Sequence, residues 1–194
     1  MKTLVFASAN PNKIKEVSSK LGGYPLLGLT DIGCLEELPE TGRTLEENAL
    51  QKAEYVYNNY NCDCFADDTG LEIEALNNEP GVDTAFYAGP ERNAEANMNK
   101  VLENLKDKNN RRARFKTVIV LITGGTRHQF TGIVTGTIAP APKGTGGFGY
   151  DPIFIPDGYE QTFAELSMEI KNSISHRGKA IGLLAEFLEN QPKD

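Results

Sequence analysis

A hairpin signal in the middle of the chain, preceded by alternating strand-like and helix-like segments, limits the folds open to this sequence. Two strand-like stretches at residues 115–122 and 129–138 flank the turn-forming pair Gly124-Gly125, which is typical of an antiparallel hairpin. Earlier in the chain, a buried-strand pattern at residues 3–7 is followed by a helix pattern at residues 13–21. We therefore predict an α/β fold in which helices pack on a mixed β-sheet.

Three more segments have the period of a helix, and no linker divides the chain. Thr44 to Glu47 matches a capping box and predicts a helix to about Tyr57, and further helices are predicted at residues 91–106 and 178–190. Residues 140–152 form a loop rich in proline and glycine. We expect residues 1–194 to form a single elongated domain with two lobes.

Composition excludes several classes of protein. The net charge of −7 argues against a surface for nucleic acid, because binding to that polyanion depends on basic side chains. No apolar run is long enough to cross a bilayer and the first residues lack the apolar core of a signal peptide, so we expect a cytoplasmic protein without a membrane partner. The three cysteines form neither a disulfide framework nor a metal-binding spacing.

Two adjacent carboxylates, Asp67 and Asp68, follow a short strand pattern at residues 64–66. Thr69-Gly70 reads as a turn before the alternating stretch 71–75. On a strand, neighbouring side chains point to opposite faces, so only one of the two is expected to face a given site. One interpretation is a Mg²⁺ site, since carboxylates suit hard cations, and the other is an Asp-rich turn without chemistry.

The segment Ser8-Ala9-Asn10-Pro11-Asn12-Lys13 lies between the first strand and the first helix. A helix N-terminus offers N–H groups to an anion, and the Lys13 ammonium is within reach of a phosphate placed there. No Gly-x-x-x-x-Gly-Lys sequence occurs, which excludes a P-loop. The alternative is that Asn10 only caps the helix.

Residues 144–149 read Gly-Thr-Gly-Gly-Phe-Gly, a literal match to a dinucleotide-binding pattern. That function is rejected because the segment does not join a strand to a helix. Either the glycines let the backbone approach a flat ligand, with Phe148 or Tyr150 as a stacking ring, or this is a flexible loop. Polar residues at 171–179 could bind carbonyl oxygens or phosphates, or could be a solvated helix start.

Taken together, these segments closely resemble the inosine triphosphate pyrophosphatase family. The resemblance covers nearly the whole chain and is carried by segments in the family's order: Ser8 to Lys13, Glu40-Thr41-Gly42, Glu47-Asn48-Ala49 with Lys52, Ala66 to Leu71, Pro80-Gly81-Val82, Gly146 to Phe154, Thr162 to Leu166, and Lys171 to Ala180.

The resemblance implies a curved mixed sheet, two lobes around a cleft, and a homodimer. It also implies Mg²⁺-dependent hydrolysis of the purine nucleoside triphosphates ITP, dITP and XTP to the monophosphate and pyrophosphate, which removes them from the nucleotide pool. Asp68 is implied as the general base and, with Glu40, as a metal ligand. The implied substrate-binding residues are Ser8, Ala9, Asn10, Pro11, Asn12, Lys13, Lys52 and Lys171 for phosphates or ribose, and Thr69, Phe148, Gly149, Tyr150, Asp151, His176 and Arg177 around the nucleoside.

The chain departs from the family pattern at two places. Phe86 stands where relatives commonly have arginine, and Asn77-Asn78 replaces a usual glycine pair. Two rival functions are a Maf-like pyrophosphatase acting on other nucleotides and a nucleotide sensor without catalysis. The Ser-His-Arg segment that ends at Arg177 favours the purine family, and intact acids at Glu40 and Asp68 favour an enzyme.

Overall fold

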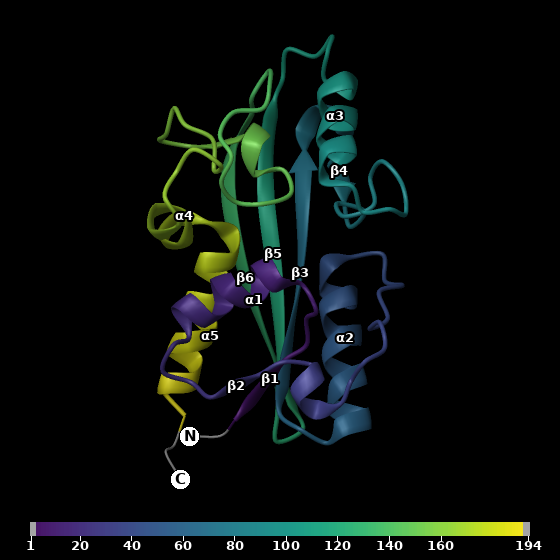
Figure 1. Cartoon of the computed structure of the whole chain (residues 1–194), viewed down its shortest axis with the longest axis vertical. Helices are drawn as coiled ribbons and strands as arrows, with labels where there is room; N and C mark the ends of the chain where they lie inside the picture. The colour runs from purple at the N-terminus through teal and green to yellow at the C-terminus, as the bar shows by residue number, and fades with distance from the viewer. Residues whose placement is uncertain (1–2, 192–194) are drawn as a thin grey trace. The chain divides into compact units, whose positions relative to one another are not determined.

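The computed structural model describes residues 3–191, and within them the strands form one mixed sheet (Figure 1). The strand order is β2-β1-β3-β5-β6-β7, with β4 paired to β3. The strands are β1 (Leu4–Phe6), β2 (Leu26–Leu27), β3 (Cys64–Ile73), β4 (Glu79–Gly81), β5 (Arg112–Thr123), β6 (Thr126–Ile138) and β7 (Phe154–Pro156). The α-helices are α1 (Pro11–Lys20), α2 (Leu45–Tyr60), α3 (Ala94–Asn104), α4 (Met168–Ile174) and α5 (His176–Glu189), and short 3-10 helices occur at Thr30–Ile32, Glu74–Leu76 and Asp151–Ile153.

The sheet combines both strand directions. Strand β1 runs parallel to β2 and to β3, whereas β4 is antiparallel to β3 and β7 is antiparallel to β6. The parallel strands are joined through helices α1 and α2, as parallel connections require. The predicted α/β class and mixed sheet are confirmed.

The chain divides into two compact units. Unit 1 comprises the residues up to Asp68, Thr117–Gly132, and the residues from Arg177 onward. Unit 2 comprises Thr69–Lys116 and Ile133–His176. Strands β3, β5 and β6 contribute residues to both units, and each unit is described below by itself.

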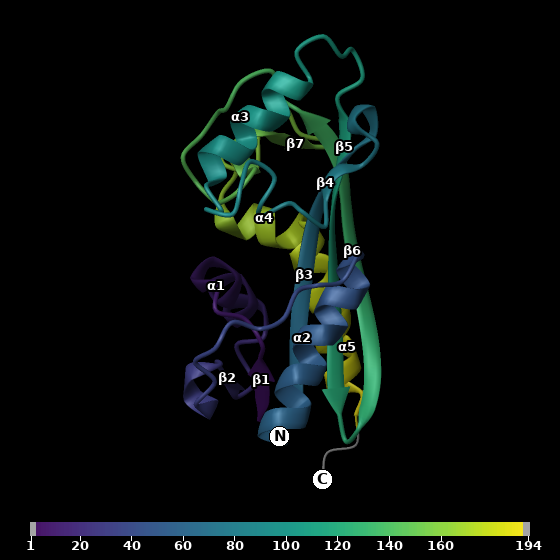
Figure 2. The ribbon, with the colours of Figure 1, turned by 90° about the vertical axis from the view of Figure 1, so that its right-hand side faces the viewer.

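In unit 1, helices cover both faces of the strands. Phe65 packs with Val17 of α1 and Ile181 of α5 in one buried cluster. The thiol of the preceding residue, Cys64, donates instead to the carbonyl oxygen of Ala53 on α2 at 3.2 Å. Because successive side chains on a strand point to opposite faces, α1 and α5 lie on one face and α2 lies on the other. Figure 2 shows α2 running alongside β3.

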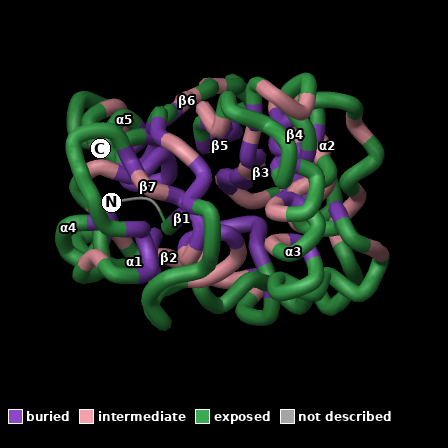
Figure 3. Tube along the Cα trace, turned by 90° about the horizontal axis from the view of Figure 1, so that it is seen from above, coloured by how far each residue is buried: buried purple, intermediate pink, exposed green. Residues whose placement is uncertain are grey.

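Unit 2 has its own core, built largely from aromatic rings. Phe115 of β5 stacks at 6.4 Å from Phe163 and tilts against Phe154 of β7 at 4.7 Å, measured between ring centroids. Val101 and Leu105 extend this buried cluster to the α3 side. In Figure 3 the buried residues of the chain concentrate on the strands, while most loop segments are exposed. Burying such side chains stabilises the fold by roughly 1.5–3 kcal/mol for each large apolar residue.

Local sequence signals located several elements correctly. Thr44 caps α2 by accepting a hydrogen bond from the Glu47 backbone N–H at 3.1 Å, and the Gly124-Gly125 turn joins β5 to β6. The Glu47 carboxylate, however, accepts from the backbone N–H of Arg43 rather than closing the capping box on Thr44.

The predicted turn at Thr69-Gly70 is wrong. Strand β3 continues through both residues. It pairs with β1 at Phe65 and with β4 from Leu71 onward, and β5 is its other neighbour in the sheet. Helix α4 was not predicted either. Among the described residues, no helix is long and apolar enough to cross a membrane.

Candidate active site

The adjacent carboxylates Asp67 and Asp68 point to opposite faces of β3. Asp67 lies on the α1 and α5 face, where its Oδ1 is 3.0 Å from Lys13 Nζ and its Oδ2 is 3.3 Å from Arg177 Nε. Asp68 lies on the α2 face, with Oδ1 at 3.6 Å from Lys52 Nζ. The alternation expected from the sequence is therefore present, although on a continuous strand.

On the two faces of β3, the pKa values of the two carboxyl groups shift in opposite directions. Burial by itself would raise the pKa of Asp67, but the ammonium of Lys13 and the guanidinium of Arg177 outweigh it and hold that pKa below its usual range. Burial raises the pKa of Asp68, and the cations of Lys52 and Lys13 do not fully offset it. Asp67 is thus an ionised structural partner at neutral pH, and Asp68 is the better proton acceptor of the two.

Glu40 and Asp68 meet at one ammonium group. Glu40 lies in the loop before α2, and its carboxylate binds Lys52 Nζ, the same atom that faces Asp68. The side chain of Glu40 is 32% exposed and that of Asp68 is 14% exposed, so both remain reachable from solvent. Asp68 Oδ2 is buried, and no described residue donates a hydrogen bond to it. Two carboxylates facing one cationic group form an arrangement that also suits a hard metal ion.

At the start of α1, the Asn10 side chain already binds backbone N–H groups that could otherwise bind an anion. Asn10 caps the helix, and its Oδ1 accepts from the backbone N–H groups of Asn12 at 3.0 Å and Lys13 at 3.3 Å. The Ser8 hydroxyl accepts in turn from the Asn10 backbone N–H at 3.2 Å. Asn10 therefore caps α1, and anion binding by this segment stays a prediction; an anion bound there would depend mainly on the Lys13 ammonium. The predicted residues Ala9, Asn10, Pro11 and Asn12 are exposed, and Ser8 is buried.

Arg177 is buried between two carboxylates. Its Nη1 lies 2.5 Å from Glu16 Oε2, and its Nε faces Asp67. The attraction of Asp67 and Glu16 raises the pKa of Arg177 although burial alone would lower it. The predicted contact of Arg177 with a purine base stays a prediction, and it would require the guanidinium to leave or to share these bonds.

In unit 2, the glycine-rich loop is held on a buried ion pair. Lys171 Nζ lies 2.7 Å from Asp151 Oδ2, and both side chains are nearly inaccessible. The same carboxylate oxygen accepts from the Phe148 backbone N–H at 2.7 Å, while Lys171 Nζ lies 4.9 Å from the Phe148 ring centroid. Gly147 has φ +70°, and a Cβ there would lie 2.0 Å from Asp151 Oδ2, so only glycine fits. The loop is a fixed part of the fold.

The other nucleoside-side residues of unit 2 differ in exposure. Tyr150 is buried and its hydroxyl donates to the Thr84 carbonyl at 2.7 Å, so the half-buried Phe148 is the ring with accessible surface. His176 is buried against Phe115, with ring centroids 4.6 Å apart. Thr69 on β3 and Gly149 are half-buried. The roles of these residues in binding stay predictions.

Two buried residues around this site were not predicted from the sequence. Glu16 of α1 is an acid 7% exposed, and Asn48 of α2 is 4% exposed with Oδ1 bound to the Gly42 backbone N–H at 2.7 Å. No local signal marks Glu16, because it lies to the side of the Val17 and Leu21 stripe of α1 and is buried only by contacts with distant residues such as Arg177. Asn48 was noted only as part of a motif.

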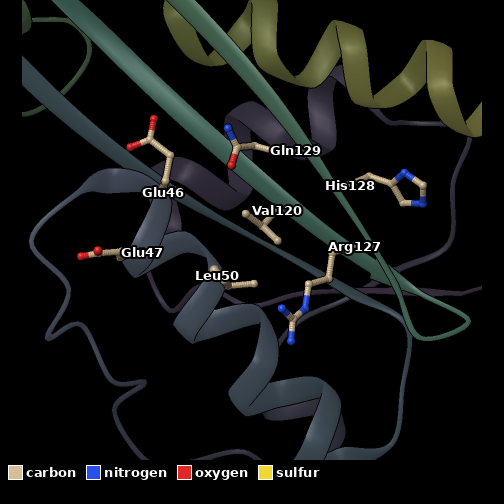
Figure 4. Close-up of a pocket in the computed structure, with 7 residues that line it drawn as sticks. All are labelled: Glu46, Glu47, Leu50, Val120, Arg127, His128 and Gln129. Carbon is tan, nitrogen blue, oxygen red and sulfur yellow. The ribbon is translucent and has the colours of Figure 1, made fainter.

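A shallow hollow of about 240 Å³ lies elsewhere in unit 1 (Figure 4). It is lined by Glu46, Glu47, Leu50, Val120, Arg127, His128 and Gln129. None of the predicted site residues lines it, and binding sites for drug-sized ligands usually enclose roughly 300–1,000 Å³. We assign no function to this hollow.

The chain is similar to known proteins over almost its full length. The sequence profile of the Ham1 family matches residues 4–187. A dITP/XTP pyrophosphatase of Flavobacterium johnsoniae is 55% identical over 186 residues, covering 95% of this chain and 97% of that protein. The dITP/XTP pyrophosphatase of Bacillus subtilis is 45% identical, covering 97% of this chain and 98% of its own length.

Solved structures show the same fold. The Ham1 protein of Staphylococcus aureus has a TM-score of 0.91 at 42% identity, covering 98% of this chain and 100% of that chain. A Ham1 protein of Coxiella burnetii has a TM-score of 0.92 at 37% identity, with the same coverage. A family match over almost the entire chain, relatives at this identity and solved structures with the same fold lead to one conclusion: this protein belongs to the Ham1 family.

Proposed function

We propose that this chain is a Mg²⁺-dependent nucleoside triphosphate pyrophosphatase that hydrolyses dITP, XTP and ITP to the monophosphate and pyrophosphate. By doing so it would keep non-standard purines out of nucleic acid. The observation that carries the proposal is the approach of Glu40 and Asp68 to one ammonium group, that of Lys52. The names of the relatives at 45–55% identity support the substrate class.

The residues fit a hard cation. Glu40 and Asp68 supply carboxylate oxygens, and Asp68 Oδ2 is a buried oxygen to which no described residue donates. The described residues contain no group of three or more metal-binding side chains, so most positions around a cation held here would be left for water and phosphate oxygens. When bound, Mg²⁺ would neutralise charge on the phosphates and lower the pKa of a coordinated water.

The chain's own residues would supply the remaining chemistry. Asp68 takes a proton from the attacking water, whose oxygen bonds to the α-phosphorus, and the bridging oxygen to the β-phosphorus leaves with pyrophosphate. The raised pKa of Asp68, caused by burial, suits a proton acceptor. Lys13 and Lys52 would supply positive charge to stabilise the departing pyrophosphate, because their ammonium groups lie next to the adjacent residues Asp67 and Asp68.

Selectivity for the base is proposed to come from the residues around Phe148 and from His176 and Arg177. Donors aimed at the 6-oxygen of the purine would be left unpaired by a 6-amino group. A site built on such hydrogen bonds can discriminate by roughly 10⁴-fold.

The test is a nucleotide panel of dITP, XTP, ITP, dATP and ATP, assayed for monophosphate and pyrophosphate with Mg²⁺ or with EDTA. We expect release from the first three only, and none with EDTA. Asp68→Asn should lower kcat by at least about 10²-fold. The matched control is Asp83→Asn, an exposed carboxylate on a unit 2 loop, which should leave kcat unchanged.

The same panel separates the rivals. Binding of ITP without turnover would favour a nucleotide sensor, whereas release from pyrimidine nucleotides would favour a Maf-like activity. Near-normal turnover by Asp68→Asn would remove Asp68 from the role of base.

A homodimer in the cytoplasm is also proposed, on the basis of the family resemblance. The chain departs from that family's pattern at Phe86, where relatives commonly carry arginine. Phe86 is 36% exposed, and the guanidinium of Arg92 lies 4.6 Å from the centroid of its ring. The positively charged side chain of Arg92 therefore lies beside this position, although Phe86 itself carries no charge. Sedimentation should give twice the chain mass of 21.2 kDa, and a monomer at micromolar concentration would contradict the dimer.

A further inference from the structure

The backbone that follows Glu40 is bound to one side of helix α2. Three successive N–H groups each donate to a side chain of that helix: Thr41 to Gln51 Oε1 at 2.9 Å, Gly42 to Asn48 Oδ1 at 2.7 Å, and Arg43 to Glu47 Oε2 at 2.6 Å. Exposed loop N–H groups can bond to water instead, so three consecutive N–H groups bound by one helix tie this stretch of backbone to α2. The segment that carries Glu40 is thus fixed to α2.

The same helix also binds the Glu40 side chain. Asn48 and Lys52 are four residues apart, so they lie above one another on one face of α2. Lys52 pairs with the Glu40 carboxylate, and Asn48 binds the backbone two residues further on. Helix α2 therefore sets both the path of the loop and the direction of the carboxylate.

Asn48 is the buried member of this set. It is 4% exposed, whereas Glu47 is exposed and Gln51 is half-buried. Water can replace an exposed acceptor at little cost, but losing a buried acceptor leaves the Gly42 N–H unsatisfied. The contact is also tight, because a Cβ on Gly42 would lie 2.8 Å from Asn48 Oδ1 and 2.6 Å from Glu47 Cβ.

We propose that Asn48 is a positioning residue that holds the Glu40 carboxylate in place to share a divalent cation with Asp68. This inference rests on the proposed function, in which those two acids bind the metal. Asn48 does not touch the cation. It acts through the Gly42 backbone, so its removal should weaken metal binding without removing a ligand.

The test measures Mn²⁺ binding to the full-length protein, from the electron paramagnetic resonance signal of the free ion. Asn48→Ala should raise the Mn²⁺ dissociation constant about 10-fold or more, as residues that orient metal ligands typically do. It should also raise the Mg²⁺ concentration needed for half-maximal turnover of dITP. The matched control is Tyr55→Phe on the same side of α2, which loses only a bond from its hydroxyl to Glu36. That variant should bind Mn²⁺ as the wild type does.

Two further variants keep the outcome interpretable. Gly42→Ala should push the Gly42 N–H away from Asn48 while the sequence of α2 stays unchanged. It should also weaken Mn²⁺ binding, and it replaces Asn48→Ala as the test variant if Asn48→Ala does not fold. If folded Asn48→Ala or Gly42→Ala binds Mn²⁺ as tightly as wild type while Glu40→Gln binds it weakly, the positioning role is overturned and the proposed function stands. If Glu40→Gln also binds Mn²⁺ normally, the metal assignment fails.

Discussion

At the scale of single residues, Asp67 and Asp68 show how one peptide bond separates two kinds of carboxylate. Both are on β3, but Asp67 faces two cations on the α1 and α5 side, and Asp68 faces Lys52 with one oxygen left without a hydrogen bond from any described residue. The pKa of Asp67 is lowered by Lys13 and Arg177 despite burial, and that of Asp68 is raised by burial. The first carboxylate stabilises the fold, and the second is costly to keep ionised.

The same substitution should therefore have opposite effects at these positions. Asp67→Asn leaves the buried Arg177 and Lys13 without that negative charge, and should lower the free energy of unfolding by about 3 kcal/mol. Asp68→Asn removes an ionised group that burial disfavours, and should leave the free energy of unfolding at pH 7 equal or higher. Urea unfolding measures both. The idea fails if Asp68→Asn destabilises the protein as much as Asp67→Asn does.

At the scale of elements, the close contact between β6 and β7 depends on a missing side chain. Gly136 of β6 lies opposite Pro156 of β7, and a Cβ on it would lie 2.2 Å from the Ile155 carbonyl oxygen. That distance is far below van der Waals contact, and the obstacle is backbone that cannot rotate away. Strand β7 can pair here only because residue 136 is glycine.

A pair of glycine substitutions tests this point. Gly136→Ala should lower the free energy of unfolding by more than about 2 kcal/mol, because β7 must shift to make room. Gly182→Ala, in the exposed part of α5 with open space around the new methyl group, should instead raise it by about 0.5–1 kcal/mol. Thermal and urea unfolding compare the two. Equal effects of either sign would contradict the steric argument.

At the scale of the whole molecule, the predicted site residues are divided between the two units. Unit 1 carries the acids and the lysines, including Glu40, Lys52 and Asp68, while unit 2 carries the Phe148 loop and His176. In each unit, the polar side chains are held by ion pairs, such as Lys13 with Asp67 and Lys171 with Asp151. Ionised carboxylates thus contribute to the stability of both units, which makes stability dependent on pH.

Acid should destabilise the protein mainly below pH 4. The hydrogen bonds from Arg112 lower the pKa of Asp157 to about 2, and that of Asp67 is also below its usual range. Since both folded-state values lie under the unfolded value of about 3.9, their contribution is present above pH 4 and is lost as pH falls through the folded values. The urea midpoint at pH 7, 4, 3 and 2 should therefore fall most steeply in the last two steps.

A variant checks the origin of this fall. The side chain of Asp157→Asn does not titrate, so acid cannot remove a contribution to stability at that site. The urea midpoint of this variant should therefore change less between pH 4 and pH 2 than that of the wild type. Protonation of Asp68 affects stability in the opposite direction: because its pKa is raised in the folded state, taking up a proton there favours folding. A midpoint that stays constant down to pH 2 would contradict the role assigned to the lowered carboxyl groups.

Signals within a few residues were enough to predict the α/β class, the cap at Thr44, the turn at Gly124-Gly125 and the alternation of Asp67 and Asp68. The resemblance to a known family, carried by ordered motifs, indicated the substrate class that the relatives support. Each of these depends on neighbouring residues or on a pattern written along the chain, so the sequence alone contains it.

Contacts between distant segments were decided only by the tertiary structure. Thr69-Gly70 has the composition of a turn, yet both residues lie within strand β3, which is part of a sheet with β1, β4 and β5 as its neighbours. The burial of Arg177 between Glu16 and Asp67 joins residues up to 161 positions apart. Local propensities differ by about 1 kcal/mol or less. Burying a large apolar side chain, or breaking a buried ion pair, changes the free energy of folding by several kcal/mol. Packing therefore overrides the local signal wherever the two disagree.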